Sequence, residues 1–229
     1  MRKVITIDGL AGTGKSSIAK GLATKLNWIH LNSGLLYRAV AYEALSNNVD
    51  TSSEELLCEI IKRNKPNLDI EKEKSEPFVK WGERKLSAEL HTEDVSLTAS
   101  KISQFLKVRQ ALLPAQQNAF PTSNLIAEGR DMGTVVFPDA HIKFFVEVSP
   151  EIKAKRRLSQ LQEQKTSNIN GLTLEKVQKN LEERDRKDAE RATSPTIPAK
   201  DGVIVDNSTV TLTETIDKMY NIASSKGLI

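Results

Sequence analysis

A glycine-rich run near the start of the chain has the spacing of a phosphate-binding loop. It reads Gly-x-x-x-x-Gly-Lys-Ser and follows a short apolar run. A loop that wraps around a polyphosphate must aim backbone N–H groups inward and approach the ligand more closely than a Cβ allows. Lys15 would bring a positive charge to the terminal phosphates, and Ser16 would offer a hydroxyl to Mg²⁺. The pattern predicts a triphosphate site formed by Gly9, Leu10, Ala11, Gly12, Thr13, Gly14, Lys15, Ser16 and Ser17.

Several arginines elsewhere in the sequence could bind a second phosphorylated reactant. They are Arg38, Arg109, Arg130, Arg184 and Arg191. Arg38 falls in the first turns of an expected helix, where acidic residues are usual, so it is either a phosphate ligand or a solvated side chain. Arg184, Asp188 and Arg191 share one helix face, as a binding surface or as a plain ion-pair stripe. Phosphoryl transfer depends mainly on positioning and on charge neutralisation, which such arginines supply.

The elements that must position these side chains alternate between strand and helix patterns. Apolar runs at 4–7, 28–31, 125–127, 142–148 and 202–206 predict strands, and helical periodicity lies between most of them. This alternation predicts an α/β fold with a five-stranded parallel sheet covered by helices. Asn32, Ser33 and Gly34 are expected to cap a helix, and one helix is expected from Asp94 to Phe120 with a kink at Pro114.

The charged segment from Glu128 to Asp131 directly follows an expected strand. Open α/β sheets bind ligands at the carboxyl ends of their strands, although a salt-bridged turn is the alternative. Residues 66–93 predict a small antiparallel β insert, with a mobile loop at 71–74 as the alternative. Two charged helices joined by a polar gap predict a lid over 151–199. The whole chain is then one domain, with a core of 1–65, 94–150 and 200–229.

Composition favours a globular protein without nucleic-acid or membrane partners. The 229 residues are 38% hydrophobic and carry a net charge of +3, which is too balanced for a nucleic-acid surface. The first apolar run ends at Asp8, and no run reaches transmembrane length, so we expect a cytoplasmic protein. Cys58 has no partner for an internal disulfide, and the three histidines lack metal-ligand spacing. Without a heptad repeat, we expect a monomer.

Longer motifs resemble bacterial cytidylate kinases over nearly the whole chain. They are Asp8-Gly9 with the phosphate loop and the segments 32–39, 128–140 and 183–188, of which 129–140 is the most specific. The resemblance implies a P-loop NTPase fold and transfer of the γ-phosphate of ATP to CMP or dCMP with Mg²⁺. The family usually has Asp where this chain has Asn32, often Ile-Arg-Thr at 90–92, and in many members Gly-Thr or Ser-Thr at 16–17. None of these departures removes a group that the reaction needs.

The same resemblance implies roles for the separate residues. Ser100, Arg109 and Asp131 would contact the cytosine, Arg184 and Asp188 the sugar, and Arg38, Arg130 and Arg191 the monophosphate. Ser33 and Tyr37 join this CMP site, Arg157 joins the ATP site, and catalysis is assigned to Lys15, Arg130, Arg184 and Arg191. An acidic acceptor beside hydroxyl and guanidinium donors would distinguish cytosine from uracil.

Two other functions remain open from the sequence. Another P-loop kinase could act on UMP, AMP or a non-nucleotide acceptor, which would not need the three cytosine-contacting residues. A nucleotide-dependent switch or a nucleic-acid-binding regulator is the second, although the sequence lacks an Asn-Lys-x-Asp guanine motif and a basic groove with interleaved aromatics. ATP turnover that depends on an added phosphate acceptor would distinguish the kinase from the switch or regulator.

Overall fold

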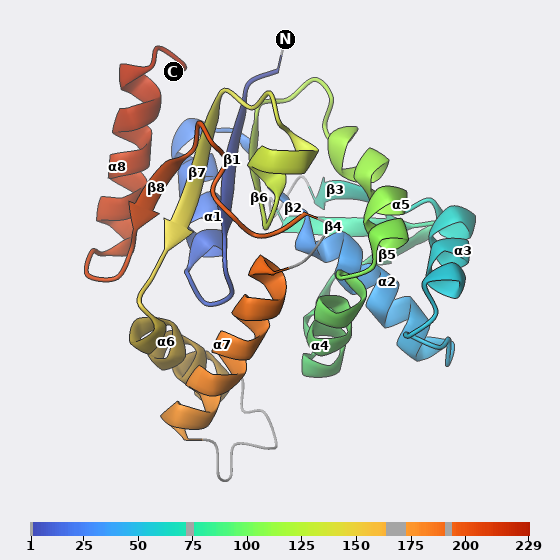
Figure 1. The fold of residues 1–229 in the computed structure, drawn as a ribbon. Coiled ribbons are helices and arrows are strands. Elements are labelled where there is room, and N and C mark those ends of the chain that lie inside the picture. Colours follow the sequence, from blue (N-terminus) through green and yellow to red (C-terminus); the bar gives the residue numbers. More distant parts are fainter. Residues whose placement is uncertain (1, 72–75, 164–172, 191–193) are drawn as a thin grey trace.

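The computed structural model describes residues 2–71, 76–163, 173–190 and 194–229 (Figure 1). A parallel sheet forms its centre. Its strands are β1 (Val4–Gly9), β2 (Ile29–Asn32), β6 (Leu125–Gly129), β7 (Ile142–Glu147) and β8 (Val203–Asp206). Their order across the sheet is β2-β6-β1-β7-β8, and each neighbouring pair is parallel. This confirms the five-stranded parallel sheet expected from the sequence.

Helices cover both faces of this sheet, because its central strands are apolar on both sides. The helices that pack on it are α1 (Lys15–Leu26), α2 (Gly34–Ser46), α5 (Leu106–Gln117) and α8 (Leu212–Ser225). Ile5 and Ile7 of β1 meet Ile18 of α1 in the core on one face. Val4 of the same strand belongs to the core on the other face, with Leu36 of α2. The alternation of side chains along β1 thus joins the two halves of the core.

The insert is a small antiparallel sheet that packs beside α2 and α5. It follows α3 (Glu54–Asn64), and its elements are β3 (Asn67–Glu71), β4 (Glu76–Trp81), β5 (Arg84–Leu86) and the 3₁₀ turn η1 (Ala88–His91). The strands pair in the order β3-β4-β5. Trp81 is only 1% exposed and belongs to the same core cluster as α2, so the insert continues the main core. The predicted β insert is confirmed.

The single helix expected from Asp94 to Phe120 is wrong. The structure contains α4 (Glu93–Ile102) and then α5, and Pro114 lies inside α5. The break comes at Phe105, whose backbone is extended. Arg109 donates a 2.9 Å hydrogen bond to the Ser103 carbonyl and so holds the bend. Hydrophobic periodicity continues across such a break, because both helices bury their apolar faces in the same core.

Of the residues expected to cap α2, Asn32 does so in the structure, whereas the Ser33 side chain does not. The Ser33 side chain accepts no capping hydrogen bond and instead donates to the Glu128 carbonyl at 2.9 Å. Asn32 takes the capping role, because its Oδ1 accepts from the Gly34 N–H at 3.0 Å. Ser33 therefore ties the start of α2 to the end of β6.

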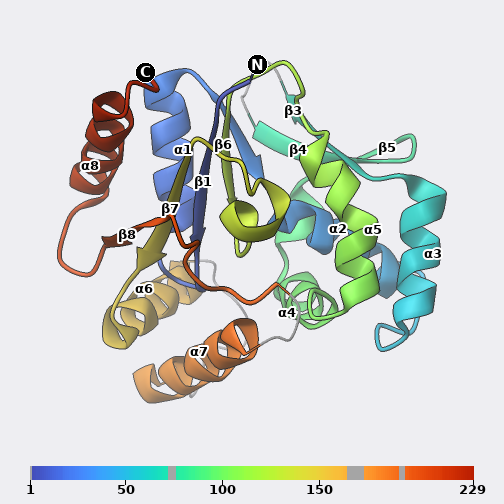
Figure 2. The same cartoon turned by 45° about the horizontal axis from the view of Figure 1, so that its top comes forward.

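Two further helices lie at the carboxyl ends of the strands. They are α6 (Pro150–Glu163) and α7 (Leu174–Ala189), which pack against each other beneath the sheet in Figures 1 and 2. They correspond to the helices of the expected lid, and the polar gap between them lies outside the described residues. The short π-helical turn η2 (Met132–Val136) follows β6. Among the described residues, no helix combines the length and apolar character needed to span a bilayer.

Candidate active site

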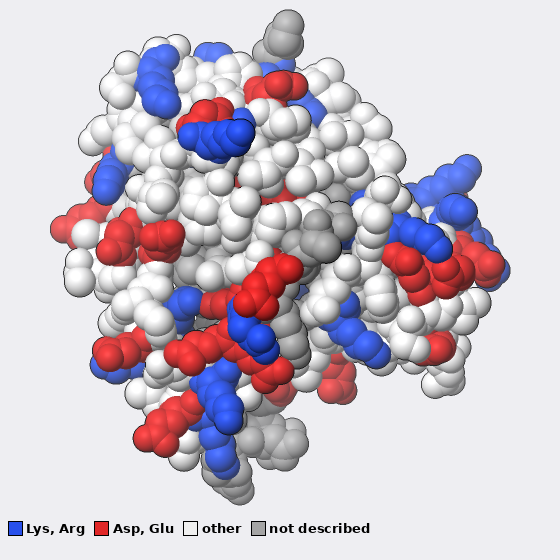
Figure 3. All heavy atoms as spheres, in the orientation of Figure 1, with Lys and Arg blue, Asp and Glu red and all other residues white. Residues whose placement is uncertain are grey.

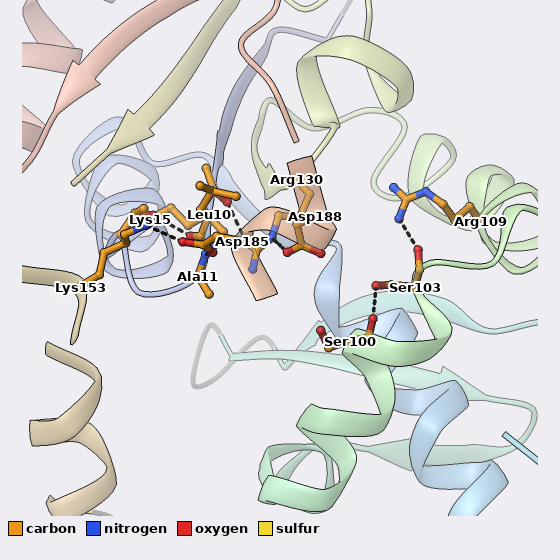
Figure 4. Close-up of polar contacts among 12 residues, drawn as sticks. Leu10, Ala11, Lys15, Ser100, Ser103, Arg109, Arg130, Lys153, Asp185 and Asp188 are labelled. Carbon is orange, nitrogen blue, oxygen red and sulfur yellow. Dashed lines mark hydrogen bonds and ion pairs between the residues drawn. The ribbon is translucent and has the colours of Figure 1, made fainter. Parts of the chain in front are cut away.

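The phosphate loop joins β1 to α1 and needs its glycines. Gly12 and Gly14 have φ angles of +75° and +81°, which L side chains rarely adopt. A Cβ on Gly9 would lie 2.6 Å from the Val146 carbonyl oxygen. Lys15 begins α1 and donates to the Leu10 carbonyl at 3.1 Å (Figure 4). The loop therefore presents the positive end of α1 and an ammonium group, the features that bind phosphate.

A buried carboxylate lies behind the loop at the end of β6. Glu128 is 1% exposed, and neither of its oxygens makes a hydrogen bond of good geometry within the described part of the chain. His30 Nε2 lies 3.1 Å from Glu128 Oε1. Burial acts to raise the pKa of Glu128, but His30, Lys15 and Ser16 outweigh it and lower that pKa. The Glu128 carboxylate thus remains available for a cation.

This arrangement fits a divalent metal that arrives with a nucleotide. The described residues contain no cluster of three or more His, Cys, Asp or Glu that would hold a metal by itself. Hard divalent cations in phosphoryl-transfer enzymes take one or two protein groups and complete their shell with phosphates and water. The Ser16 hydroxyl and the Glu128 carboxylate, which His30 also contacts, would supply such groups beside the phosphate loop.

One pocket contains most of the predicted acceptor residues together with Lys15 and Ser16. It is lined by Lys15, Ser16, Asn32, Ser33, Gly34, Tyr37, Arg38, Ser96, Ala99, Ser100, Ser103, Arg109, Glu128, Gly129, Arg130, Asp131 and Asp188. These residues come from β2 and β6, from α1, α2, α4, α5 and α7, and from the short segments that follow β2, β6 and α4. The fold therefore brings residues more than 150 positions apart in the sequence to one cavity beside the phosphate loop.

At the end of this pocket that α5 forms, Arg109 and Asp131 make a buried ion pair. Arg109 donates to the Asp131 carboxylate and to the Ser103 carbonyl, and its guanidinium lies 5.5 Å from the Tyr37 ring centroid. Burial opposes the charge of Arg109, but Tyr37 and Asp131 outweigh it and raise the pKa of the guanidinium. Ser103 also donates to the Ser100 carbonyl at 2.9 Å. Charged donor and acceptor groups are thereby fixed in a desolvated site.

Two further arginines, Arg38 and Arg130, line the same pocket. Arg130 Nε donates to Asp188 at 3.0 Å, and its NH1 donates to the Gly9 carbonyl at 2.8 Å (Figure 4). Arg38 donates to the Leu90 carbonyl at 2.8 Å and to Ser96 Oγ at 2.6 Å. Burial, followed by the nearby charge of Arg157, lowers the pKa of Arg38. Two cations in this position suit a phosphate dianion.

Comparison with known proteins identifies the family. A family model described as cytidylate kinase matches residues 5–225. The chain belongs to the cytidylate kinase family. A cytidylate kinase of Erwinia tasmaniensis is 41% identical over 225 residues, covering 97% of this chain and 96% of the relative. One from Proteus mirabilis is 42% identical over 219 residues, covering 94% and 93%.

The solved structures support the fold. A crystal structure of an uncharacterized protein from Eubacterium ventriosum matches with a TM-score of 0.51 at 13% identity, covering 98% of this chain and 99% of that one. At this identity the likeness concerns the fold alone. The expected family and fold are thus confirmed, and a kinase of this family uses nucleotide substrates and a divalent metal.

The roles assigned to the individual site residues all stay predictions, and two of these residues cannot be placed. Arg191 and the side chain of Arg184 lie outside the described residues. Arg157 is a prediction for the ATP site, and its described influence is on Arg38. Its neighbour Arg156 donates to the Asn207 carbonyl at 2.9 Å, while Asn207 Nδ2 donates to the Thr13 carbonyl at 3.0 Å.

Sequence reasoning did not find Arg156 and Asn207. Both line a second hollow beside the phosphate loop, with Gly12, Gly14, Ser17, Ser159 and Leu212. The available signal was the position of Asn207 immediately after β8, at the same sheet edge as the phosphate loop. Arg156 had no signal that separated it from the other basic residues of α6.

Asp8 is another residue whose role the sequence did not reveal. Its two carboxylate oxygens accept hydrogen bonds from the Met132 and Gly133 N–H groups, each at 2.8 Å. Burial raises the pKa of Asp8 to about 6 in spite of these bonds. Asp8 thereby fastens the segment that carries Arg130 and Asp131 to the strand that carries the phosphate loop.

Proposed function

We propose that this chain transfers the γ-phosphate of ATP to CMP or dCMP in the presence of Mg²⁺, forming ADP and CDP or dCDP. The observation that carries the proposal is the buried Arg109–Asp131 pair, which lies in the same pocket as Lys15 and Ser16. A nucleoside monophosphate bound in this pocket would lie next to the triphosphate loop. Its base would reach the ion pair, and its phosphate would reach the arginines.

Recognition of the base follows from the chemistry of the pair. Cytosine presents an amino donor where uracil presents a carbonyl oxygen, so the Asp131 carboxylate would accept from cytosine and repel uracil. Arg109 holds Asp131 in place and offers further donors to the ring acceptors. The Ser100 hydroxyl adds a third polar group on α4. A site built around such groups strongly rejects a ligand that leaves them unpaired.

The reacting phosphates would lie between the loop and the arginines. Arg38 and Arg130, with Arg191, would bind the acceptor phosphate, while Lys15 would neutralise charge on the transferred group. Arg184 would join Arg130, Arg191 and Lys15 in stabilising the transition state, and Arg184 and Asp188 would hold the sugar. Ser16 and Glu128 would hold Mg²⁺, which supplies further charge neutralisation when it is bound.

Ser33, Tyr37 and the lid complete the proposal. Ser33 and Tyr37 line the acceptor pocket, and Tyr37 also contacts the Arg109 guanidinium through its ring. Residues 151–199 would close over both substrates and exclude water, with 66–93 as the insert on the acceptor side. A monomeric state and a cytoplasmic location stay predictions.

The test is a coupled assay of ADP release with CMP, dCMP, UMP, AMP and GMP. CMP and dCMP should be the preferred acceptors. Asp131→Asn should lower kcat/KM for CMP by about 10- to 100-fold, the range of one hydrogen bond to a charged group. Asp139→Asn, an exposed change in the same segment, is the matched control and should behave as wild type.

Two outcomes would contradict the proposal. If no monophosphate stimulates ADP release, the reaction is wrong. If UMP or AMP is preferred and Asp131→Asn leaves that preference unchanged, the chain is a kinase for another acceptor.

A further inference from the structure

The helix α7 touches the backbone of the phosphate loop through a buried carboxylate. The Ala11 N–H donates to Asp185 Oδ1 at 3.3 Å, and Lys153 Nζ of α6 lies 2.5 Å from Asp185 Oδ2 (Figure 4). Asp185 and Lys153 are each only 7% exposed. On the face in Figure 3, by contrast, charges of both signs are interspersed over the exposed surface of α6 and α7. The buried pair therefore differs from an ordinary surface ion pair.

An apolar cluster surrounds this polar contact. Ala11 of the loop packs with Ala154 of α6 and with Val177 and Leu181 of α7. The next loop residue is equally close, since a Cβ on Gly12 would lie 3.5 Å from Lys153 Cβ. The first part of the phosphate loop is thus built into the small core between the two helices.

A second carboxylate on α7 holds the other side of the same loop segment. Asp188 lies one helical turn after Asp185 and accepts from Arg130, which also donates to the Gly9 carbonyl. The carbonyl of Leu10, between the two held residues, accepts from Lys15 Nζ and Thr13 Oγ1, each at 3.1 Å. Contacts with α7 therefore flank the residue that orients Lys15.

An anion at this place needs a counter-ion. A carboxylate beside a loop that binds polyphosphate would repel the ligand, and a buried charge without a partner strongly destabilises a protein. Lys153 neutralises Asp185 and leaves its Oδ1 free to accept from Ala11. We propose that Asp185 is a positioning residue of the phosphate loop, that its carboxylate fixes the Ala11 amide, and that Lys153 serves as its counter-ion. The inference rests on the proposed nucleotide site.

Three variants separate the hydrogen bond from the charge. Lys153→Met leaves the Asp185 carboxylate unpaired beside the loop. Lys153→Met with Asp185→Asn removes both charges and keeps an acceptor oxygen for the Ala11 amide. Lys153→Met with Asp185→Leu removes both charges and the acceptor, with a side chain of similar size that suits the adjoining apolar cluster. Arg186→Gln, an exposed change on the same helix, is the control.

Calorimetry with ADP and, separately, with CMP provides the test, alongside thermal unfolding. The Leu double variant should bind ADP about fivefold more weakly than the Asn double variant, the effect of about one hydrogen bond, while CMP binding changes less than twofold. Lys153→Met should bind ADP more weakly than the Asn double variant, so that adding Asp185→Asn rescues it. The Arg186→Gln control should match wild type.

Equal ADP affinities of the Asn and Leu double variants would overturn the inference, even if their melting temperatures differ. Failure of Asp185→Asn to rescue Lys153→Met would overturn the role of Lys153. Wild-type protein that binds neither ADP nor ATP would instead refute the proposed function, so the two failures are distinguishable.

Discussion

The buried carboxylate of Asp8 predicts how the free energy of unfolding changes with pH. The structure gives both the direction and the size of that change. Asp8 is only 4% exposed, and burial raises the pKa of its carboxylate from 3.8 to about 6. An acid whose pKa is higher in the folded state stabilises the fold most at low pH, because the folded protein keeps a proton that the unfolded chain has lost. As pH rises through 6, this contribution disappears.

The size follows from the two pKa values. A change from 3.8 to about 6 corresponds to about 3 kcal/mol at pH values above both. Between pH 4.5 and 7.5 the change amounts to about 2 kcal/mol, since part of it has occurred by pH 4.5. Asp8→Asn removes this dependence. It also removes one acceptor and leaves the Gly133 or Met132 N–H unsatisfied, at a cost of about 1–3 kcal/mol that does not vary with pH.

Urea unfolding of wild type and Asp8→Asn from pH 4.5 to 7.5 measures the effect. The variant should be clearly less stable than wild type at pH 4.5, and its stability relative to wild type should improve by about 2 kcal/mol by pH 7.5. Other titrating groups cancel in the difference between the two proteins. A stability difference that stays constant within about 0.5 kcal/mol over this range would refute the reasoning.

Three further predictions concern the loop and the metal. Lys15→Ala should abolish ADP release but leave CMP binding by calorimetry largely intact, because Lys15 serves the transferred phosphate, and wild-type turnover would contradict its assignment. Glu128→Gln should weaken the Mg²⁺ enhancement of ADP binding several-fold with CMP affinity unchanged, since it removes a charge beside Ser16, and an unaltered Mg²⁺ titration would rule out that role. Gly9→Ala should lower the free energy of unfolding in urea by about 1–3 kcal/mol, because its Cβ would lie 2.6 Å from the Val146 carbonyl oxygen. An unchanged free energy of unfolding would show that the neighbouring strand moves to accommodate the Cβ without cost.

Local patterns in the sequence were sufficient for the sheet, the phosphate loop and the insert. The glycines in the run from Gly9 to Ser16 predict its conformation, and in the structure all three of them have positive φ angles. Apolar runs located the strands because a strand buried on both faces must be apolar on both. The break at Phe105 was not predicted, because the hydrophobic periodicity of two helices that share a core continues across a short interruption between them.

Many residues of the candidate site could be identified from sequence motifs, but the contacts between these residues could not be predicted. The sequence by itself determined that Arg109 and Asp131 were candidate base-binding residues, through the resemblance, and that Arg130 follows a strand. Only the tertiary structure paired Arg109 with Asp131 and placed Asp185 on the Ala11 amide. The physical reason is that motif spacing reflects the local backbone, whereas a buried carboxylate is matched to its partner by packing between elements distant in the sequence.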